Sequence, residues 1–265
     1  MPSQLRPDSY ARHTLERYTG SSVKDFGSHI LLCNFDRYIE DFARITGNEI
    51  TRGYWSVVHD RKRDVSIINH GVGSPTAGIA MHCLSYLDEI NCVLMLGMCG
   101  GIDDELEIGD IIIPTASIRD EGTSRHYIPH DVPALPSIHI NRICEQVINS
   151  KLNIIPKSGI LMTTDYRMWE FDNEFIDYIQ KHRIMAIDME IATIFAVGYA
   201  LNVPTGALML VSDLPLQKGG IKSKDSAEEI FHTYTDQHLK LGLQILEAAR
   251  NELSSQPITP LINQP

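Results

Sequence analysis

The sequence predicts a single α/β domain with a central mixed, largely parallel β-sheet that is flanked by helices on both faces. Short apolar runs alternate with helical patterns along the chain, as in sheets covered on both sides. The 265 residues, 43% of them hydrophobic, supply enough apolar side chains for one sizeable core. No internal repeat or low-complexity block interrupts this alternation. We therefore expect one folded domain over 26–252, a polar N-terminal arm or short helix over 1–25 and a proline-rich tail over 253–265.

The strands are predicted from short apolar runs bounded by polar or turn residues. The run "IIIP" ends in a proline, which fits the end of a strand better than its centre. The expected strands are 28–33, 64–69, 91–96, 110–116, 158–163, 184–187 and 205–212.

The helices are predicted from apolar residues at helical spacing. Pro75 suits the first turn of its helix, where a missing N–H costs nothing. Ser226 and Glu229 form a capping box before the last helix. The expected helices are 35–46, 75–90, 137–150, 170–182, 189–202 and 226–252.

Composition limits the classes of partner. The formal net charge of −11 disfavours nucleic acid and anionic membranes, because the long-range field repels both. The five cysteines form no C-x-x-C pair, which fits buried, reduced thiols. The N-terminal segment has no apolar signal-peptide core, and no apolar run approaches the roughly 20 residues needed to span a bilayer. We expect a cytoplasmic protein.

Ligands of such sheets bind at the carboxyl ends of the strands, so residues that directly follow strands are the first candidates. Asp36 and Arg37 follow strand 28–33 at the start of a helix; a cap and a surface arginine would explain them equally well. The segment "NHGVGSPTAG" places Gly73 before a helix N-terminus, which favours an anion or a sugar hydroxyl. A plain tight turn is the alternative.

The segment "NCVLMLGMCGGI" predicts a strand over 91–96 followed by a glycine turn over 97–101. Gly97 and the glycines after it would let a ligand approach the backbone closely. The turn carries no lysine, arginine or hydroxyl, and Met95 and Met98 stand where a phosphate site would need a cation and a donor.

Two further candidate regions lie at the ends of predicted strands. The segment 162–170 gathers groups that suit a purine ring: Thr164, Asp165, Tyr166, Arg167 and Trp169. Its structural alternative is a helix cap with a buried tryptophan. Asp213 follows an apolar strand, where partial burial would raise the pKa of its carboxyl group and suit it to act as a general acid. The glycine-rich segment after it bears Lys218, Lys222 and Lys224. A mobile surface loop with ordinary lysines is the alternative for that segment.

Two acidic residues, Asp188 and Glu190, follow an apolar run. Burying a carboxylate in such surroundings is unfavourable, so we expect these residues either to have hydrogen-bond partners or to serve a function. A helix N-terminal cap is the structural alternative. His126, His130 and His139 do not fall on one helical turn and are interrupted by prolines, so we expect no metal site. No metal or organic cofactor is implied.

Taken in order, these segments resemble the nucleoside phosphorylase/nucleosidase superfamily over roughly residues 28–250. "DMEIAT" resembles the family's signature that places Met189 and Glu190 on the ribose. "LVSD" resembles the strand whose aspartate, here Asp213, protonates N7 of the leaving purine. "LGMCGGIDDELEIGDIII" resembles the family's glycine-rich core. Within the superfamily, "TTDYRMWE" and "DMEIATIFAVGYA" are most similar to AMP nucleosidases, which hydrolyse AMP to adenine and ribose 5-phosphate.

The resemblance also implies the nucleophile. In the family's phosphorylases an arginine and a hydroxyl hold inorganic phosphate at the positions of Met95 and Met98. Cys33 replaces a phosphate-loop glycine, whereas Arg37 is retained. Losing charge-assisted hydrogen bonds weakens an anion site strongly. We therefore expect water to be the nucleophile, with Gly97 and its neighbours around the sugar.

The 5′-phosphate of the substrate needs cations of its own. The candidates are Arg37, Arg52 (from a neighbouring subunit), Arg119 and Lys222. The family's dimers, often combined into hexamers, imply a homo-oligomer. The alternatives are a purine nucleoside phosphorylase, an inactive purine-nucleotide sensor and a 5′-methylthioadenosine-type nucleosidase, although the last would leave the basic loop without a purpose.

Overall fold

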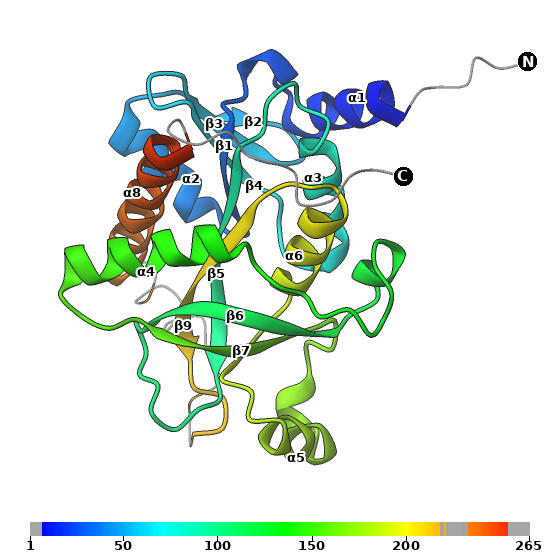
Figure 1. Ribbon diagram of the computed structural model, residues 1–265, viewed down its shortest axis with the longest axis vertical. Helices are drawn as coiled ribbons and strands as arrows, with labels where there is room; N and C mark the ends of the chain where they lie inside the picture. The colour runs from blue at the N-terminus through cyan, green and yellow to red at the C-terminus, as the bar shows by residue number, and fades with distance from the viewer. Residues whose placement is uncertain (1–6, 218–219, 221–229, 231–232, 254–265) are drawn as a thin grey trace, which may run out of the picture.

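The computed structural model describes residues 7–217, 220, 230 and 233–253 of the chain (Figure 1). The first six residues of the predicted arm and the predicted tail from residue 254 lie outside this range. So do Lys222 and the capping box of Ser226 and Glu229.

The described residues form one nine-stranded sheet in the order β2-β3-β4-β1-β5-β8-β7-β6-β9. β9 also pairs with β5, so β5, β8, β7, β6 and β9 close into a five-stranded barrel, and the other strands extend from β5 as an open sheet. The strands are β1 (His29–Cys33), β2 (Thr51–Arg52), β3 (Ser56–Asp60), β4 (Val65–Asn69), β5 (Cys92–Gly101), β6 (Ile111–Asp120), β7 (Lys157–Thr164), β8 (Ala186–Asp188) and β9 (Thr205–Asp213).

The sheet is mixed. Five strand pairings are parallel and four are antiparallel among the described residues, so the expected predominance of parallel pairs is not found. Barrel closure accounts for two of the antiparallel pairs, because β8 meets β5, and β9 meets β6, in opposite directions. All seven predicted strands are present. β2 and β3, a short antiparallel extension at the open edge, are missed by the sequence patterns.

The predicted glycine turn over 97–101 is wrong. β5 continues to Gly101, paired in parallel with β9 as far as Asp213 and in antiparallel fashion with β8. Gly97 is a packing position: a Cβ there would lie 2.6 Å from Cε and 2.7 Å from Sδ of Met209. Gly97 and Gly101 therefore let the barrel strands pack closely, whereas Met98, Cys99 and Gly100 between them border a cavity.

Helices cover both faces of the open sheet, as predicted (Figure 1). One layer contains α1 (Pro7–Thr19), α3 (Ser74–Leu84) and α6 (Ile191–Ala200), and the other contains α2 (Asp36–Thr46), α4 (Ile138–Leu152) and α8 (Thr235–Leu253). α5 (Asn173–Lys181) lies beside the barrel. Short 3₁₀ turns occupy η1 (Val23–Asp25), η2 (Thr123–His126) and η3 (Trp169–Phe171).

The N-terminal segment, expected as an arm or a short helix, contains α1. Two predicted helices have different boundaries. α3 ends at Leu84 rather than at residue 90. The predicted helix 170–182 is divided, because the side chain of Asp172 accepts N–H bonds from Glu174 and Phe175 and starts α5 there. An N-terminal cap of this kind sets where a helix begins.

No helix in the described part of the chain is long and apolar enough to cross a membrane.

Candidate active site

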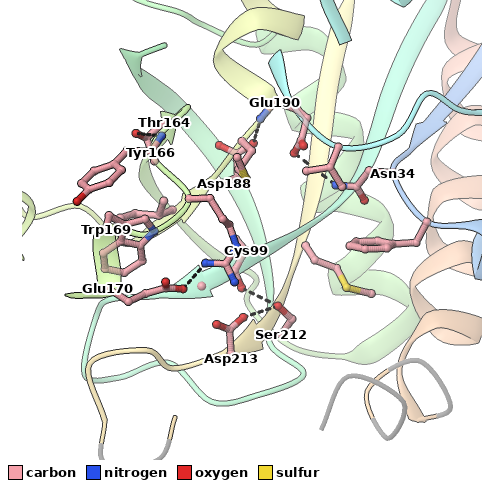
Figure 2. Close-up of a pocket in the computed structure, with 17 residues that line it drawn as sticks. Asn34, Cys99, Thr164, Tyr166, Trp169, Glu170, Asp188, Glu190, Ser212 and Asp213 are labelled. Carbon is pink, nitrogen blue, oxygen red and sulfur yellow. Dashed lines mark hydrogen bonds and ion pairs between the residues drawn. The ribbon is translucent and has the colours of Figure 1, made fainter. Parts of the chain in front are cut away.

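A cavity of about 320 Å³ lies at the carboxyl ends of the strands, where the sequence analysis places the candidate residues (Figure 2). β1, β7, β8 and β9 each bring to it their last residue or the residue that follows. Its walls are formed by Asn34, Phe35, Val72, Met98, Cys99, Gly100, Thr164, Tyr166, Arg167, Trp169, Glu170, Ile187, Asp188, Met189, Glu190, Ser212 and Asp213.

Asp213 is the last residue of β9 and is 9% exposed. The hydroxyl of Ser212 lies 2.6 Å from Oδ1 of Asp213, to which it can donate, and 3.3 Å from the carbonyl oxygen of Cys99. On the neighbouring strand β5, Gly100 lies close to this group: a Cβ there would be 3.7 Å from Oδ2 of Asp213 and 3.2 Å from Cγ of Pro215. The strand end and the neighbouring hydroxyl thus fix the orientation of this carboxyl group.

Glu190 lies on the opposite side of the cavity and is 1% exposed (Figure 2). The backbone N–H of Gly73 donates to Oε1 at 2.7 Å, and Nδ2 of Asn34 donates to Oε2 at 3.4 Å. Burial raises the pKa of Glu190, and the nearby carboxylate of Asp188 raises it further. Its two hydrogen bonds oppose this shift, because they favour the ionised form.

Asp188 provides the cap that the sequence analysis considered for the acidic pair. Its Oδ2 accepts the N–H groups of Glu190 at 2.8 Å and Ile191 at 2.7 Å, while Thr163 donates to Oδ1 at 2.6 Å. Burial raises the pKa of Asp188 despite these bonds. Because Asp188 caps α6, the side chain of Glu190, which makes no cap bond, is available to the cavity.

The segment after β7 forms the wall next to Asp213 (Figure 2). Thr164 donates to Oδ2 of Asp120 at 2.7 Å and accepts the N–H of Tyr166 at 3.1 Å, which anchors the turn. Trp169 is buried, whereas Tyr166 is 44% exposed at the cavity. Together they present aromatic surface on which a planar ring can stack.

Arg167 and Glu170 add a charged pair to the same wall, with 2.6 Å between Nη1 and Oε1. Asp165 does not line the cavity. Its exposed side chain accepts the N–H of Gly122 at 3.0 Å and so joins this turn to the loop after β6.

Met189 and Met98 supply apolar parts of the cavity wall. Ser74 donates to the carbonyl oxygen of Met189 at 2.8 Å, which joins the start of α3 to the start of α6. Met95, by contrast, is fully buried in the core. Of the two methionines singled out in the sequence, only Met98 borders the cavity.

Several sequence-selected residues lie away from the cavity walls. Gly73 contributes through its N–H bond to Glu190, while Gly97 packs inside the barrel. Arg37 is paired with Asp41 at 2.9 Å in α2. Arg52, on the edge strand β2, is half-exposed and 3.8 Å from Glu40.

Arg119 is buried in β6, where its guanidinium holds the following loop. Nε donates to Oγ of Ser124 at 2.8 Å, and the terminal nitrogens donate to the carbonyl oxygens of Ile128, Pro129 and Val132 at 2.5–3.0 Å. Burial lowers its pKa. Its donors are thus occupied by protein acceptors.

Some wall residues were missed by the sequence reasoning. Asn34 directly follows a predicted strand, and Ser212 precedes the selected Asp213, so position alone could have identified both. Glu170 falls at the start of a predicted helix. Phe35, Val72, Cys99 and Ile187 are likewise not selected individually from the sequence, whereas Gly100 belongs to the glycine run that is selected. In the described part of the chain no group of three or more histidine, cysteine, aspartate or glutamate side chains is arranged to hold a metal ion.

Known proteins resemble this chain over most of its length. An AMP nucleosidase of Escherichia coli K12 is 28% identical over 285 residues, covering 90% of this chain, which spans 58% of the length of that relative. The crystal structure of an AMP nucleosidase from Bacteroides thetaiotaomicron is 33% identical, with a TM-score of 0.82, and the match covers 94% of this chain and 100% of that one. A purine nucleoside phosphorylase from Toxoplasma gondii shares the fold at 20% identity, with a TM-score of 0.74 over 88% and 95% of the two chains.

The family described as the phosphorylase superfamily matches residues 23–247. This range contains the closed barrel and every described wall residue of the cavity, and of the helices in the two layers it leaves out only α1 and the end of α8. The chain belongs to the phosphorylase superfamily.

Proposed function

We propose that the protein hydrolyses the N-glycosidic bond of AMP to adenine and ribose 5-phosphate. The observation that carries the proposal is the placement of Asp213 and Glu190 on opposite sides of one cavity, separated by apolar and aromatic wall. Two AMP nucleosidases among the relatives support AMP as the substrate.

The reaction breaks the bond between C1′ and N9. A sugar that leaves its base develops positive charge, as in other glycosidic cleavages through an oxocarbenium-like state. Asp213, in its protonated form, donates to N7 and neutralises the departing adenine. Water adds to C1′, and the proton that it loses replaces, by way of solvent, the proton that Asp213 gave to N7, so the products are adenine and ribose 5-phosphate.

Glu190 acts on the sugar side. Its ionised form, which the hydrogen bonds from Gly73 and Asn34 favour against the effect of burial, accepts hydrogen bonds from the ribose hydroxyls, and its negative charge stabilises the developing cation. Gly73 and Asn34 hold the carboxylate in place, so little reorganisation is needed during the reaction. Met189 packs against the sugar, while Tyr166, Trp169, Thr164 and Arg167 bind the base.

Water, rather than inorganic phosphate, is the proposed nucleophile. Arg167 is the one cationic side chain among the described wall residues, and it is bound to Glu170. A phosphate dianion needs charge-assisted donors, which Met98 and Met95 cannot supply. The alternative is a purine nucleoside phosphorylase, since enzymes of that name from Buchnera are 27% identical over 192 residues. An inactive nucleotide sensor is less consistent with the two buried carboxyl groups.

The 5′-phosphate ligands remain part of the proposal. Arg37 lies in the helix that directly follows the wall residues Asn34 and Phe35, so it is the first candidate. Arg52 would act from a neighbouring subunit of a dimer-based hexamer, and Lys222 from the segment that follows β9 in the sequence. Arg119 would have to release its loop to take part.

The test is to incubate the pure protein with AMP, with and without inorganic phosphate, and to identify the products. Adenine and ribose 5-phosphate formed without added phosphate are the expected result. Strict phosphate dependence, a preference for adenosine and release of ribose 1-phosphate would establish the phosphorylase instead. Saturable AMP binding without any product would establish the sensor.

A further inference from the structure

The ion pair of Arg167 and Glu170 forms part of the cavity wall, and its carboxylate member, Glu170, has no task in the reaction steps above. The side chain of Glu170 is 5% exposed, whereas that of Arg167 is 55% exposed. The carboxylate is therefore the buried member of the pair. Burying a carboxylate is unfavourable unless hydrogen bonds compensate for the lost water.

One oxygen of Glu170 is satisfied by Arg167, with 2.6 Å between Oε1 and Nη1. Within the described ranges no protein group donates to the second oxygen, Oε2, and it does not belong to the fully buried polar atoms that lack a partner. Because Glu170 lines the cavity, this oxygen is an acceptor available to a bound molecule.

Glu170 lies on the same side of the cavity as Asp213, across from Glu190 and Asn34 (Figure 2). In a purine, N7 and the substituent at C6 are neighbours on one edge of the ring. If Asp213 faces N7, the adjoining wall faces the C6 substituent. Adenine presents an amino donor there, whereas guanine and hypoxanthine present an oxo acceptor.

We infer that Glu170, positioned by Arg167, selects purine nucleotides that carry an amino group at C6. The amino group donates to Oε2, whereas an oxo group would face the carboxylate without a proton between them. A site built to hydrogen-bond one substituent rejects the analogue that cannot make the bond, because buried polar groups are then left unpaired. This inference rests on the proposed function for the orientation of the purine.

The first experiment compares kcat/KM for AMP and for IMP, which differ at C6. The wild-type protein should prefer AMP. In Glu170→Gln the amide can rotate to donate to the oxo group, so the AMP/IMP ratio should fall by roughly tenfold or more, as expected for a lost hydrogen bond to a charged group. Glu174→Gln is the matched control, since Glu174 is exposed and outside the cavity wall; its ratio should stay within twofold of wild type.

A second measurement separates this inference from the reaction itself. Calorimetric binding of free adenine and hypoxanthine to the same variants reports base selection without turnover. If wild type hydrolyses no AMP but binds adenine selectively, and Glu170→Gln loses that selectivity, the hydrolase proposal fails and the base-selection inference stands.

The inference is overturned if Glu170→Gln melts like wild type and keeps the wild-type AMP/IMP ratio. Should Glu170→Gln not fold, Glu170→Asp provides the test, because it keeps the charge but withdraws the acceptor by one methylene. Its AMP/IMP ratio should also fall, and an unchanged ratio in that variant rejects the role of Glu170.

Discussion

The backbone N–H of Gly73 donates a 2.7 Å hydrogen bond to Oε1 of Glu190, although the two residues are 117 positions apart in the chain. Gly73 precedes α3 and Glu190 precedes α6, and these two helices pack against each other. Gly73 has φ of +109°, a conformation that residues with a side chain rarely adopt. The backbone conformation of one glycine thus directs a donor at the proposed ribose-binding carboxylate.

Gly73→Ala should therefore impair catalysis. Space is available, since a Cβ would meet Pro75 only at 3.8 Å, so the cost is conformational and about 1–3 kcal/mol. Relaxation of the loop would withdraw the N–H from Glu190. We expect kcat for AMP hydrolysis to fall roughly tenfold or more, as for other hydrogen bonds to charged groups.

Gly71→Ala is the matched control for this strain. Gly71 also has positive φ, at +79°, and an added Cβ would meet no atom within 4 Å, but its N–H is bonded to Asn69. Both variants should lose similar stability in urea unfolding, while the kcat loss should be much larger for Gly73→Ala. Equal kcat losses would show that loop strain, rather than the bond to Glu190, is responsible.

The raised pKa of Glu190 predicts a pH-dependent stability. Between the ordinary value of 4.5 and the raised pKa, the folded protein binds more protons at this site than the unfolded chain does. The contribution of Glu190 to stability is therefore full below pH 4.5 and is lost as the pH rises through this window. Within it, wild type should lose up to about 1.4 kcal/mol per pH unit relative to Glu190→Gln.

Denaturant unfolding of both proteins across pH 5 to 8 measures this difference. Asp188 also has a raised pKa, and its charge raises the pKa of Glu190. In Asp188→Asn the unfolding free energy should therefore fall less steeply with pH than it does in wild type. Parallel stability curves for wild type and Glu190→Gln would rule out a raised pKa at Glu190.

The sequence identifies the two carboxyl groups because each has a local signal. Asp213 ends an apolar strand, and Glu190 lies in a short acidic motif before a helix. The alternation of strands and helices likewise predicts the two helix layers. Structural features that depend only on neighbouring residues in the chain can therefore be predicted from the sequence.

Structural features that depend on residues far away in the chain could not be predicted in this way. The glycine run after Leu96 reads as a turn, because nothing local shows that β8 and β9 pair with it. Arg119 is attractive as a phosphate ligand, yet its acceptors are backbone carbonyl oxygens 9–13 residues away. β2 has only two residues, and β3, with the sequence SVVHD, contains only two consecutive aliphatic side chains, so neither gives a clear strand pattern.

Gly97→Ala tests the packing role of that glycine. The new methyl group would overlap the end of the Met209 side chain, so we expect a loss of about 1–3 kcal/mol in unfolding free energy. Met209→Val removes the overlapping atoms. The double variant should therefore lose less unfolding free energy than the sum of the losses in the two single variants. Simple additivity of the two losses would contradict a packing conflict between these residues.

Arg119→Met tests whether this arginine holds the loop or binds the 5′-phosphate. The substitution removes donors to four acceptors between Ser124 and Val132, so the melting temperature should fall by several degrees. The ratio of KM for AMP to KM for adenosine should stay close to wild type. A rise in KM confined to the phosphorylated substrate would instead make Arg119 a phosphate ligand.

Asp213→Asn tests the general acid. The amide cannot donate a carboxyl proton to N7, so kcat for AMP should fall roughly 10²–10⁴-fold, while Ser212 can still donate to the amide oxygen and preserve the fold. A ribose 5-phosphate that carries p-nitrophenol at C1′ in place of adenine is the control substrate. Its leaving group departs as a stable anion and needs little protonation, so kcat for its cleavage should fall much less in Asp213→Asn. If both substrates lose activity equally, Asp213 acts through binding or charge rather than by donating the proton.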